Sequence, residues 1–217
     1  MRQFYSLGWC PGTGGGISIR DGDTIYLSPS GVQKERLRPE QMFAIDSSTF
    51  EFRPLSEQNP ATSSMKPSQC WHLFELAFKF RNAGAVVHSH GIETVLAGKL
   101  FEGQPTFVVK DLEMIKGLRN GEGKAYQNDE VLAIPIIENT RREGDLVVSM
   151  QAAMLAYPDA PAVLVRNHGL YVWGKDWKEA KCQAECLHYL MKLLCEMQKL
   201  MPVINVDNKL DKESKID

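Results

Sequence analysis

Two valine-rich apolar runs constrain this chain most, because each of them leads into histidine. Residues 85–87 (AVV) precede His88-Ser89-His90, and residues 162–165 (AVLV) precede Arg166-Asn167-His168. Short apolar runs of β-branched residues predict buried strands. Side chains at positions i and i+2 of a strand point to the same face, so His88 and His90 can reach one ion without distortion of the chain. With His168 as a third ligand, one coordination position stays open, as it does in catalytic zinc sites.

The chain has five histidines, and three of them lie at the ends of these two runs. An isolated H-x-H pair also occurs among packing histidines, so the pair alone does not define a metal site. The other two, His72 and His188, fall within helix-like stretches among bulky neighbours. We expect them to be packing or surface residues. The sequence therefore predicts a single metal site, held by His88, His90 and His168.

Length and composition indicate one globular domain and exclude several kinds of partner. The chain has 217 residues, of which 43% are hydrophobic and 24% charged, and its net charge is -2. Such a balance gives no general attraction to nucleic acid. No apolar run approaches the ~20 residues of a membrane helix, and the N-terminus lacks a signal-peptide profile. The five cysteines show no paired framework, which favours reduced thiols and a cytoplasmic location.

Turn signals and hydrophobic periodicity predict strands mixed with helices. Asp21-Gly22-Asp23 reads as a hairpin turn, Ser68 and Asp176 as helix caps, and Gly84 as a helix end. This mixture argues for an α/β sandwich rather than a regularly alternating parallel sheet. We expect one catalytic domain over 1–200 and a polar, mobile tail over 201–217. The expected strands are 17–20, 24–27, 85–87, 107–109, 131–137, 162–165 and 170–173, and the expected helices are 68–82, 92–100, 145–157 and 177–200.

Three segments have the composition of anion-binding turns. Residues 11–16 (PGTGGG) lack the G-x-G-x-x-G register of a dinucleotide fold, but their backbone N–H groups can cradle an anion. Ser28-Pro29-Ser30-Gly31 is a second candidate, and Ser68-Gln69 at a helix start is a third. Each alone reads as an ordinary turn or cap. Together with a metal motif, they favour a small phosphorylated substrate.

Two charged segments are harder to interpret. Glu113 lies among apolar neighbours in residues 111–117 (DLEMIKG). Desolvation there could raise the pKa of its carboxyl and fit it for acid–base catalysis. The residues alone nevertheless favour a solvated surface glutamate. We likewise expect Lys34, Glu35 and Arg36 to form a solvated face.

Six motifs together resemble the methylthioribulose-1-phosphate dehydratase family of the class II aldolase/adducin superfamily, and the match runs from near residue 3 to about 200. They are residues 12–18 (GTGGGIS), 28–35 (SPSGVQKE), 88–90 (HSH), 113–117 (EMIKG), 135–140 (PIIENT) and 166–169 (RNHG). The resemblance implies a three-layer α/β/α sandwich with a central mixed, largely antiparallel sheet. It also implies a homotetramer with sites near subunit boundaries. Members usually have a helix before residue 3, so that helix is expected to be missing here.

The resemblance also implies the roles of individual residues. One Zn²⁺ per subunit would be held by the three histidines, Glu113 would be the proton donor or acceptor, and Cys70 would lie beside the substrate. Sugar-phosphate aldolases of the superfamily place a glutamate where this chain has Cys70. Glu113 would then have to supply the carboxylate, which favours dehydration over carbon–carbon cleavage. The expected phosphate-binding residues are Gly15, Ser30, Gly31, Ser68 and Gln69.

The implied activity is that of a hydro-lyase in methionine salvage. It would convert 5-methylthioribulose 1-phosphate, a small phosphorylated ketose, to 2,3-diketo-5-methylthiopentyl 1-phosphate with the help of zinc. The main alternative is a class II sugar-phosphate aldolase or epimerase that uses the same zinc site. A different class is a non-catalytic scaffold, similar to the adducin head domains. A scaffold predicts missing metal ligands, whereas all three histidines are present.

Overall fold

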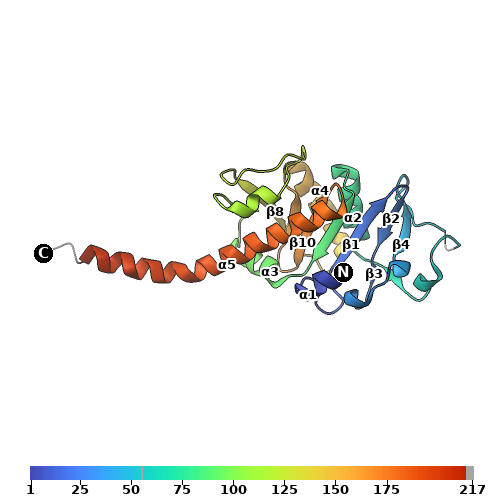
Figure 1. Cartoon of the computed structure of the whole chain (residues 1–217), viewed down its shortest axis with the longest axis horizontal. Helices are drawn as coiled ribbons and strands as arrows, with labels where there is room; N and C mark the ends of the chain where they lie inside the picture. The colour runs from blue at the N-terminus through green and yellow to red at the C-terminus, as the bar shows by residue number, and fades with distance from the viewer. Residues whose placement is uncertain (55, 214–217) are drawn as a thin grey trace.

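One eight-stranded sheet forms the centre of the molecule (Figure 1). The computed structural model describes residues 1–54 and 56–213, with side chains described as far as residue 200. All neighbouring strands are antiparallel except β8 and β9, which are parallel. The predicted mixed, largely antiparallel sheet is therefore confirmed. In spatial order the strands are β4 (Phe43–Asp46), β2 (Thr24–Leu27), β1 (Gly16–Asp21), β6 (Ala85–Ser89), β10 (Gly169–Gly174), β9 (Ala162–Val165), β8 (Leu132–Ile137) and β7 (Thr106–Val109).

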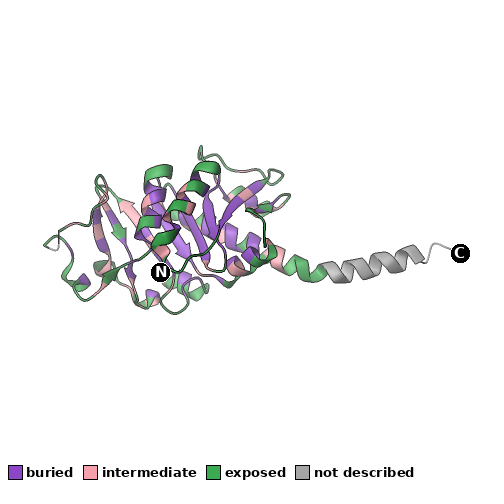
Figure 2. Cartoon of the chain, turned by 180° about the vertical axis from the view of Figure 1, so that it is seen from behind, coloured by how far each residue is buried: buried purple, intermediate pink, exposed green. Residues whose placement is uncertain are grey.

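Helices cover both faces of the sheet and complete the predicted three layers. On one face lie α3 (Ile92–Leu100) and α5 (Trp177–Glu213), and on the other lie α2 (Trp71–Arg81) and α4 (Val147–Ala156). The strands alternate between these layers, since Val87 packs in the α3/α5 core and Val86 in the α2/α4 core. Figure 2 shows the buried strands between the helices.

Several shorter elements lie outside the central sheet and its four covering helices. Helix α1 (Arg2–Ser6) and the small sheet of β3 (Pro29–Ser30) and β5 (Lys66–Pro67) lie near the N-terminal strands. Among the described residues the 3₁₀ turns are η1 (Lys34–Arg36), η2 (Pro39–Gln41), η3 (Pro60–Thr62), η4 (Glu113–Gly117) and η5 (Glu143–Leu146).

The helix ends differ from the sequence predictions in instructive ways. Helix α2 begins at Trp71 rather than residue 68, because Ser68 Oγ instead accepts a hydrogen bond from the Cys70 N–H at 3.3 Å. The C-terminal end of α2 agrees with the predicted end near residue 82, but the residue that terminates the helix is the C-cap Asn82, in the left-handed conformation (φ 46°), and not Gly84. Asparagine tolerates that conformation better than most residues. Asp176 caps α5 as predicted, with its Oδ1 accepting from the Glu179 N–H at 2.8 Å.

The C-terminal helix is longer than predicted, since α5 extends to Glu213 rather than ending near residue 200. The predicted tail at 201–217 lies outside the residues whose side chains are described, so its mobility stays a prediction. Within the described part of the chain, every helix is too short or too polar to span a lipid bilayer.

Candidate metal and substrate site

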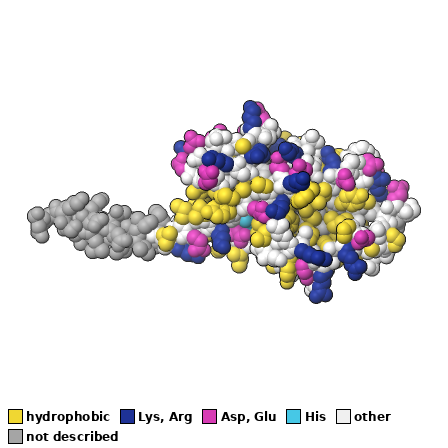
Figure 3. Space-filling model, viewed as in Figure 1, with side chains coloured by type: hydrophobic (Ala, Val, Ile, Leu, Met, Phe, Trp, Pro, Cys, Tyr) yellow, Lys and Arg dark blue, Asp and Glu magenta, His cyan; other side chains and the backbone are white. Residues whose placement is uncertain are grey.

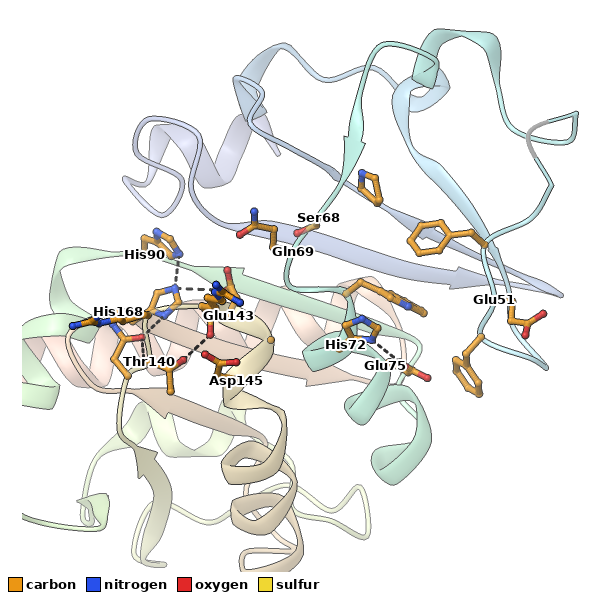
Figure 4. A pocket seen from close by; sticks show the side chains of 18 of the residues that line it. Glu51, Ser68, Gln69, His72, Glu75, His90, Thr140, Glu143, Asp145 and His168 are labelled. Carbon is orange, nitrogen blue, oxygen red and sulfur yellow. Dashed lines mark hydrogen bonds and ion pairs between the residues drawn. The ribbon is translucent and has the colours of Figure 1, made fainter.

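Three imidazoles converge where β6 and β9 end, as the sequence predicts. His88 and His90 come from the end of β6, and His168 comes from the tight turn between β9 and β10, where Asn167 has a φ of 56°. The Nε2 atom of His90 lies 2.8 Å from that of His88 and 3.1 Å from that of His168. Ligands of a tetrahedral zinc ion, about 2.1 Å from the metal, lie about 3.4 Å from one another. The three nitrogens can therefore close around one such ion with small shifts. Figure 4 shows two of these histidines, His90 and His168, beside Glu143.

The surroundings leave these nitrogens free to bind a metal. His88 Nδ1 donates to the Leu170 carbonyl at 3.2 Å, and His168 Nδ1 donates to Asn139 Oδ1 at 3.1 Å. Because both partners are acceptors, the protons sit on Nδ1 and the lone pairs on Nε2. Burial and the neighbouring imidazoles lower the pKa of His88 strongly and that of His90 to about 4. Burial also lowers the pKa of His168. Neutral imidazoles are the form that binds metal.

A carboxylate that the sequence analysis did not single out lies beside the histidines. Glu143, the first residue of η5, places Oε1 3.4 Å from His88 Nε2 and 3.7 Å from His168 Nε2. The same oxygen accepts hydrogen bonds from Cys70 Sγ at 3.1 Å and from the Tyr171 hydroxyl. The Tyr171 ring stacks on the His88 ring at a centroid distance of 3.9 Å. The site thus has a carboxylate, and that carboxylate is not the predicted Glu113.

The two groups that donate to Glu143 are held in their neutral forms. Burial, reinforced by the nearby Glu143 carboxylate, raises the pKa of the Cys70 thiol to about 12. Burial, together with the neighbouring Cys70 and Glu143, raises the pKa of the Tyr171 hydroxyl well above its ordinary value. Cys70 therefore acts as a hydrogen-bond donor near neutral pH rather than as a thiolate nucleophile.

Two cavities meet at this cluster. The main cavity, of about 1160 Å³, is lined by residues from the loop after β4, the start of α2, the loop after β8 and the β9–β10 turn, including His90, Glu143 and His168. A recess of about 70 Å³ lies beside the histidines. Five residues predicted to bind substrate line this recess or the main cavity, whereas Gly31 lines neither. The recess is lined by Thr13, Gly14, Gly15, Ser30, Lys34, Ser68, Gln69, Cys70, His88, His90 and Glu143.

Glycine is required where the N-terminal loop passes the histidine strand. A Cβ atom on Gly14 would lie 2.5 Å from His90 Nδ1. Gly15 has a φ of 69°, and a Cβ atom there would lie 3.0 Å from the His88 carbonyl oxygen. Only residues without a side chain allow the loop to run this close to His88 and His90.

The prediction that Lys34 belongs to a solvated face is wrong. Its side chain is buried, with 1% of its surface exposed, and Nζ donates to the Thr13 carbonyl at 2.8 Å and, more weakly, to the Val32 carbonyl at 3.5 Å. Burial lowers the pKa of this ammonium group. The run Lys34-Glu35-Arg36 reads as a surface run because it is charged, but it forms a 3₁₀ turn that points the lysine inward. The recess therefore has a cation in its wall.

Glu113 lies elsewhere. It begins η4, its side chain is 75% exposed, and its contact is an ion pair with Lys116 at 3.1 Å. The interpretation from residues alone, a solvated glutamate, agrees with this position. Glu113 is absent from the residues that line the main cavity and the recess. Its implied catalytic role is not supported by a position within its own subunit.

Four functional candidates escaped the sequence analysis: Glu143, Lys34, Tyr171 and Asn139. Glu143 lies in a run of polar residues whose spacing gives no period, so no local signal marks it. Tyr171 lies opposite His88 because β10 pairs with β6, a register that only the structure gives.

Comparison with known proteins gives a consistent result. The Class II Aldolase and Adducin N-terminal domain family matches residues 1–195. A probable methylthioribulose-1-phosphate dehydratase of Drosophila pseudoobscura pseudoobscura is 50% identical over 199 residues, covering 91% of this chain and 84% of the relative. The methylthioribulose-1-phosphate dehydratase of Mus musculus is 48% identical over 204 residues, covering 92% and 81% respectively.

Solved structures show the same fold at low sequence identity. An L-fuculose 1-phosphate aldolase superposes with a TM-score of 0.68 at 18% identity, covering 92% of this chain and 82% of that one. YgbL from Escherichia coli, described as a putative aldolase/epimerase/decarboxylase, gives a TM-score of 0.65 at 22% identity, covering 88% and 83%. These similarities concern the fold alone.

Proposed function

Because the chain belongs to the Class II aldolase and adducin N-terminal domain family and is about half identical to methylthioribulose-1-phosphate dehydratases, we propose that it is such a dehydratase. It is a hydro-lyase that converts 5-methylthioribulose 1-phosphate to 2,3-diketo-5-methylthiopentyl 1-phosphate in methionine salvage. The observation that carries this proposal is the convergence of three neutral imidazoles on one point beside a recess with a buried lysine.

His88, His90 and His168 would hold one zinc ion per subunit, since three nitrogen ligands with one open position are typical of catalytic zinc. Bound there, zinc supplies Lewis-acid polarisation of the C2 ketone, which makes the C3 proton removable. Leu170 and Asn139 keep His88 and His168 in the tautomer that presents Nε2. Cys70 and Tyr171 hold the Glu143 carboxylate against this cluster.

The phosphate of the substrate binds at the recess. Gly15, Ser30, Ser68 and Gln69 line this recess. Gly31, with a φ of 69°, forms the turn that follows Ser30. The buried Lys34 ammonium provides the charge that complements a phosphate dianion. The dephosphorylated ketose should therefore react far more slowly, because the binding energy of the remote phosphate is lost.

Glu113 protonates the departing C4 hydroxyl from a neighbouring subunit. Its exposure and its absence from the cavity lining support this arrangement over one within a single chain. This arrangement requires an oligomer, for which the family resemblance favours a homotetramer. Exposed apolar side chains on the α3/α5 face support such an association, and Figure 3 shows hydrophobic residues gathered along α5. These side chains are Ile92, Leu96, Leu100, Tyr189, Met197 and Leu200. We place the enzyme in the cytoplasm, consistent with its unpaired cysteines.

Zinc quantification, combined with mass analysis of the products, tests the proposal. The purified protein should contain one zinc ion per subunit and convert the methylthio-ketose phosphate into a diketone lighter by one water. An aldolase would instead yield two fragments with a shortened carbon skeleton. An epimerase would yield a product of unchanged mass. A non-catalytic scaffold would contain no stoichiometric zinc and leave the ketose unchanged.

A further inference from the structure

A second hydrogen-bonded cluster lies directly behind the metal ligands. Ser89, between His88 and His90, projects from the opposite face of β6, and its Oγ lies 2.7 Å from His188 Nε2 on α5. His188 Nδ1 lies 2.5 Å from Glu93 Oε1 at the start of α3. The Trp9 ring stacks on the His188 ring at a centroid distance of 4.0 Å. The predicted packing role of His188 therefore describes only part of what it does.

The chemistry of the partners fixes the direction of each bond. A carboxylate only accepts, so His188 Nδ1–H donates to Glu93, and Nε2 accepts from the Ser89 hydroxyl. Burial lowers the pKa of His188, which keeps the ring neutral as this pattern requires. The serine–histidine–carboxylate order resembles that of a nucleophilic triad. Ser89 is only 1% exposed, however, so no substrate reaches its hydroxyl and a positioning role remains.

The cluster connects the histidine strand β6 with the glycine-rich loop that lines the recess. The Trp9 carbonyl accepts a hydrogen bond from the His90 N–H at 2.8 Å, so Trp9 contacts the histidine strand through its backbone as well as through His188. Five residues further on, the same segment reaches Gly14 and Gly15 in the wall of the recess. A shift of the cluster would therefore move the metal ligands and the phosphate-binding loop relative to each other.

We propose that Ser89, His188 and Glu93 form a relay that positions the metal-ligating end of β6 against the glycine-rich loop. The inference rests on the proposed function, because it assigns the relay to that metal site. A substrate held at both ends tolerates little change in the distance between its anchors, since catalysis requires near-contact geometry of the reacting atoms. Hydrogen bonds behind metal ligands also contribute to metal affinity.

Zinc affinity in the full-length protein, measured by competition with a chromogenic chelator, tests the relay without any substrate. Ser89→Ala removes one hydroxyl, and Glu93→Ala removes the oxygen that accepts from His188 Nδ1–H. Glu93 is partly exposed, so both variants should fold. Each should weaken zinc binding about tenfold, in the lower part of the range for residues behind metal ligands. The visible spectrum of the Co²⁺-substituted protein should shift in both.

Gln183→Met is the matched control. Gln183 lies on the same helix α5 and is equally buried, but it bonds to the Trp173 carbonyl at 2.7 Å and to the Arg119 N–H at 2.7 Å, away from the metal strand. It should lower thermal stability while leaving zinc affinity and the Co²⁺ spectrum unchanged. The double variant Ser89→Ala/Glu93→Ala should bind zinc about as well as either single variant, because one relay can be broken only once.

Two results would overturn the proposal. One is native zinc affinity and a native Co²⁺ spectrum in both relay variants, even if dehydration of the methylthio-ketose is established. The other is strictly multiplicative effects in the double variant, which would indicate two unrelated hydrogen bonds. A loss of affinity confined to the relay variants supports the relay even if another ketose phosphate proves to be the substrate.

Discussion

The two faces of the sheet hold two glutamates in opposite environments. On the side of α2 and α4, Glu143 has a side chain that is 17% exposed and lies 3.4 Å from His88. On the side of α3 and α5, Glu113 belongs to η4, which packs against α5, and its side chain is 75% exposed. One subunit thus contains the whole cluster of His88, His90, His168 and Glu143, while the predicted acid–base residue points to solvent. The proposed action of Glu113 in a neighbouring subunit rests on this difference.

Hydrogen bonding accounts for the contrast. A carboxylate near the protein interior needs donors, and Glu143 has them in the Cys70 thiol and the Tyr171 hydroxyl. Glu113 has an exposed ion pair with Lys116, a type of contact that contributes about 0–1 kcal/mol. Its own subunit therefore does not fix Glu113 in a catalytic geometry. A neighbouring subunit would have to do so.

The largest effect on turnover should follow removal of a histidine from the cluster beside Glu143. His90→Ala deletes the ligand whose Nε2 lies 2.8 and 3.1 Å from the other two. Loss of metal removes several kcal/mol of transition-state stabilisation, so turnover should fall by about a thousandfold or more. Metal analysis after dialysis should show a protein without zinc. A full zinc complement in this variant would remove His90 from the ligand set. It would also contradict the view that the cluster around Glu143 is the metal site.

Glu113→Gln should also lose turnover but, unlike His90→Ala, should retain zinc. A positioned acid–base group contributes about 10²–10⁴-fold in rate, and Gln cannot transfer the proton. Steady-state rates and zinc content of the same preparation measure both quantities. Native turnover in Glu113→Gln would remove this residue from the mechanism.

Mixing the two inactive variants shows where Glu113 acts. If it serves a neighbouring subunit, an equimolar, randomly reassembled mixture of His90→Ala and Glu113→Gln chains should regain activity in about a quarter of its sites. Those sites combine intact histidines from one subunit with an intact glutamate from another. If Glu113 acts in its own chain, the mixture stays inactive. Each variant taken through the same reassembly alone is the control.

The contrast between the two glutamates also marks how far the sequence could predict the site. The histidines were found because strand periodicity places His88 and His90 on one face, and that rule acts locally. Similar local patterns indicated an α/β sandwich, whereas the three layers and the largely antiparallel sheet were implied by the family resemblance. Glu143 and Lys34 were missed because their burial depends on how distant segments meet, and charged residues in a polar run read as solvated. The motif around Glu113 suggested a role, but within its own chain Glu113 is exposed and lines neither cavity.

Glu143→Gln should have an intermediate effect. The amide keeps an oxygen that can accept from Cys70 and Tyr171 but removes the negative charge next to His88. Groups in such positions typically contribute about 10–100-fold to metal affinity or activity, so turnover should fall within that range. Chelator competition and steady-state kinetics at saturating zinc separate the two contributions. Unchanged zinc affinity and an unchanged turnover rate together would show that neither metal binding nor catalysis needs the Glu143 carboxylate.

The smallest effect concerns the donor to Glu143. Cys70→Ser keeps a hydroxyl that can donate to the carboxylate, whereas Cys70→Ala leaves Glu143 with one donor fewer. A hydrogen bond to a charged group contributes about 1.5–3 kcal/mol, so the alanine variant should unfold at the lower temperature. The pKa of the native thiol is raised to about 12, and the thiol therefore stays protonated well above neutral pH. The pH–rate profile of Cys70→Ser should then follow that of the native protein from about pH 6 to about pH 9. Loss of a basic limb in that profile would show that Cys70 reacts as a thiolate, and would make it a catalytic group in its own right rather than a support for Glu143.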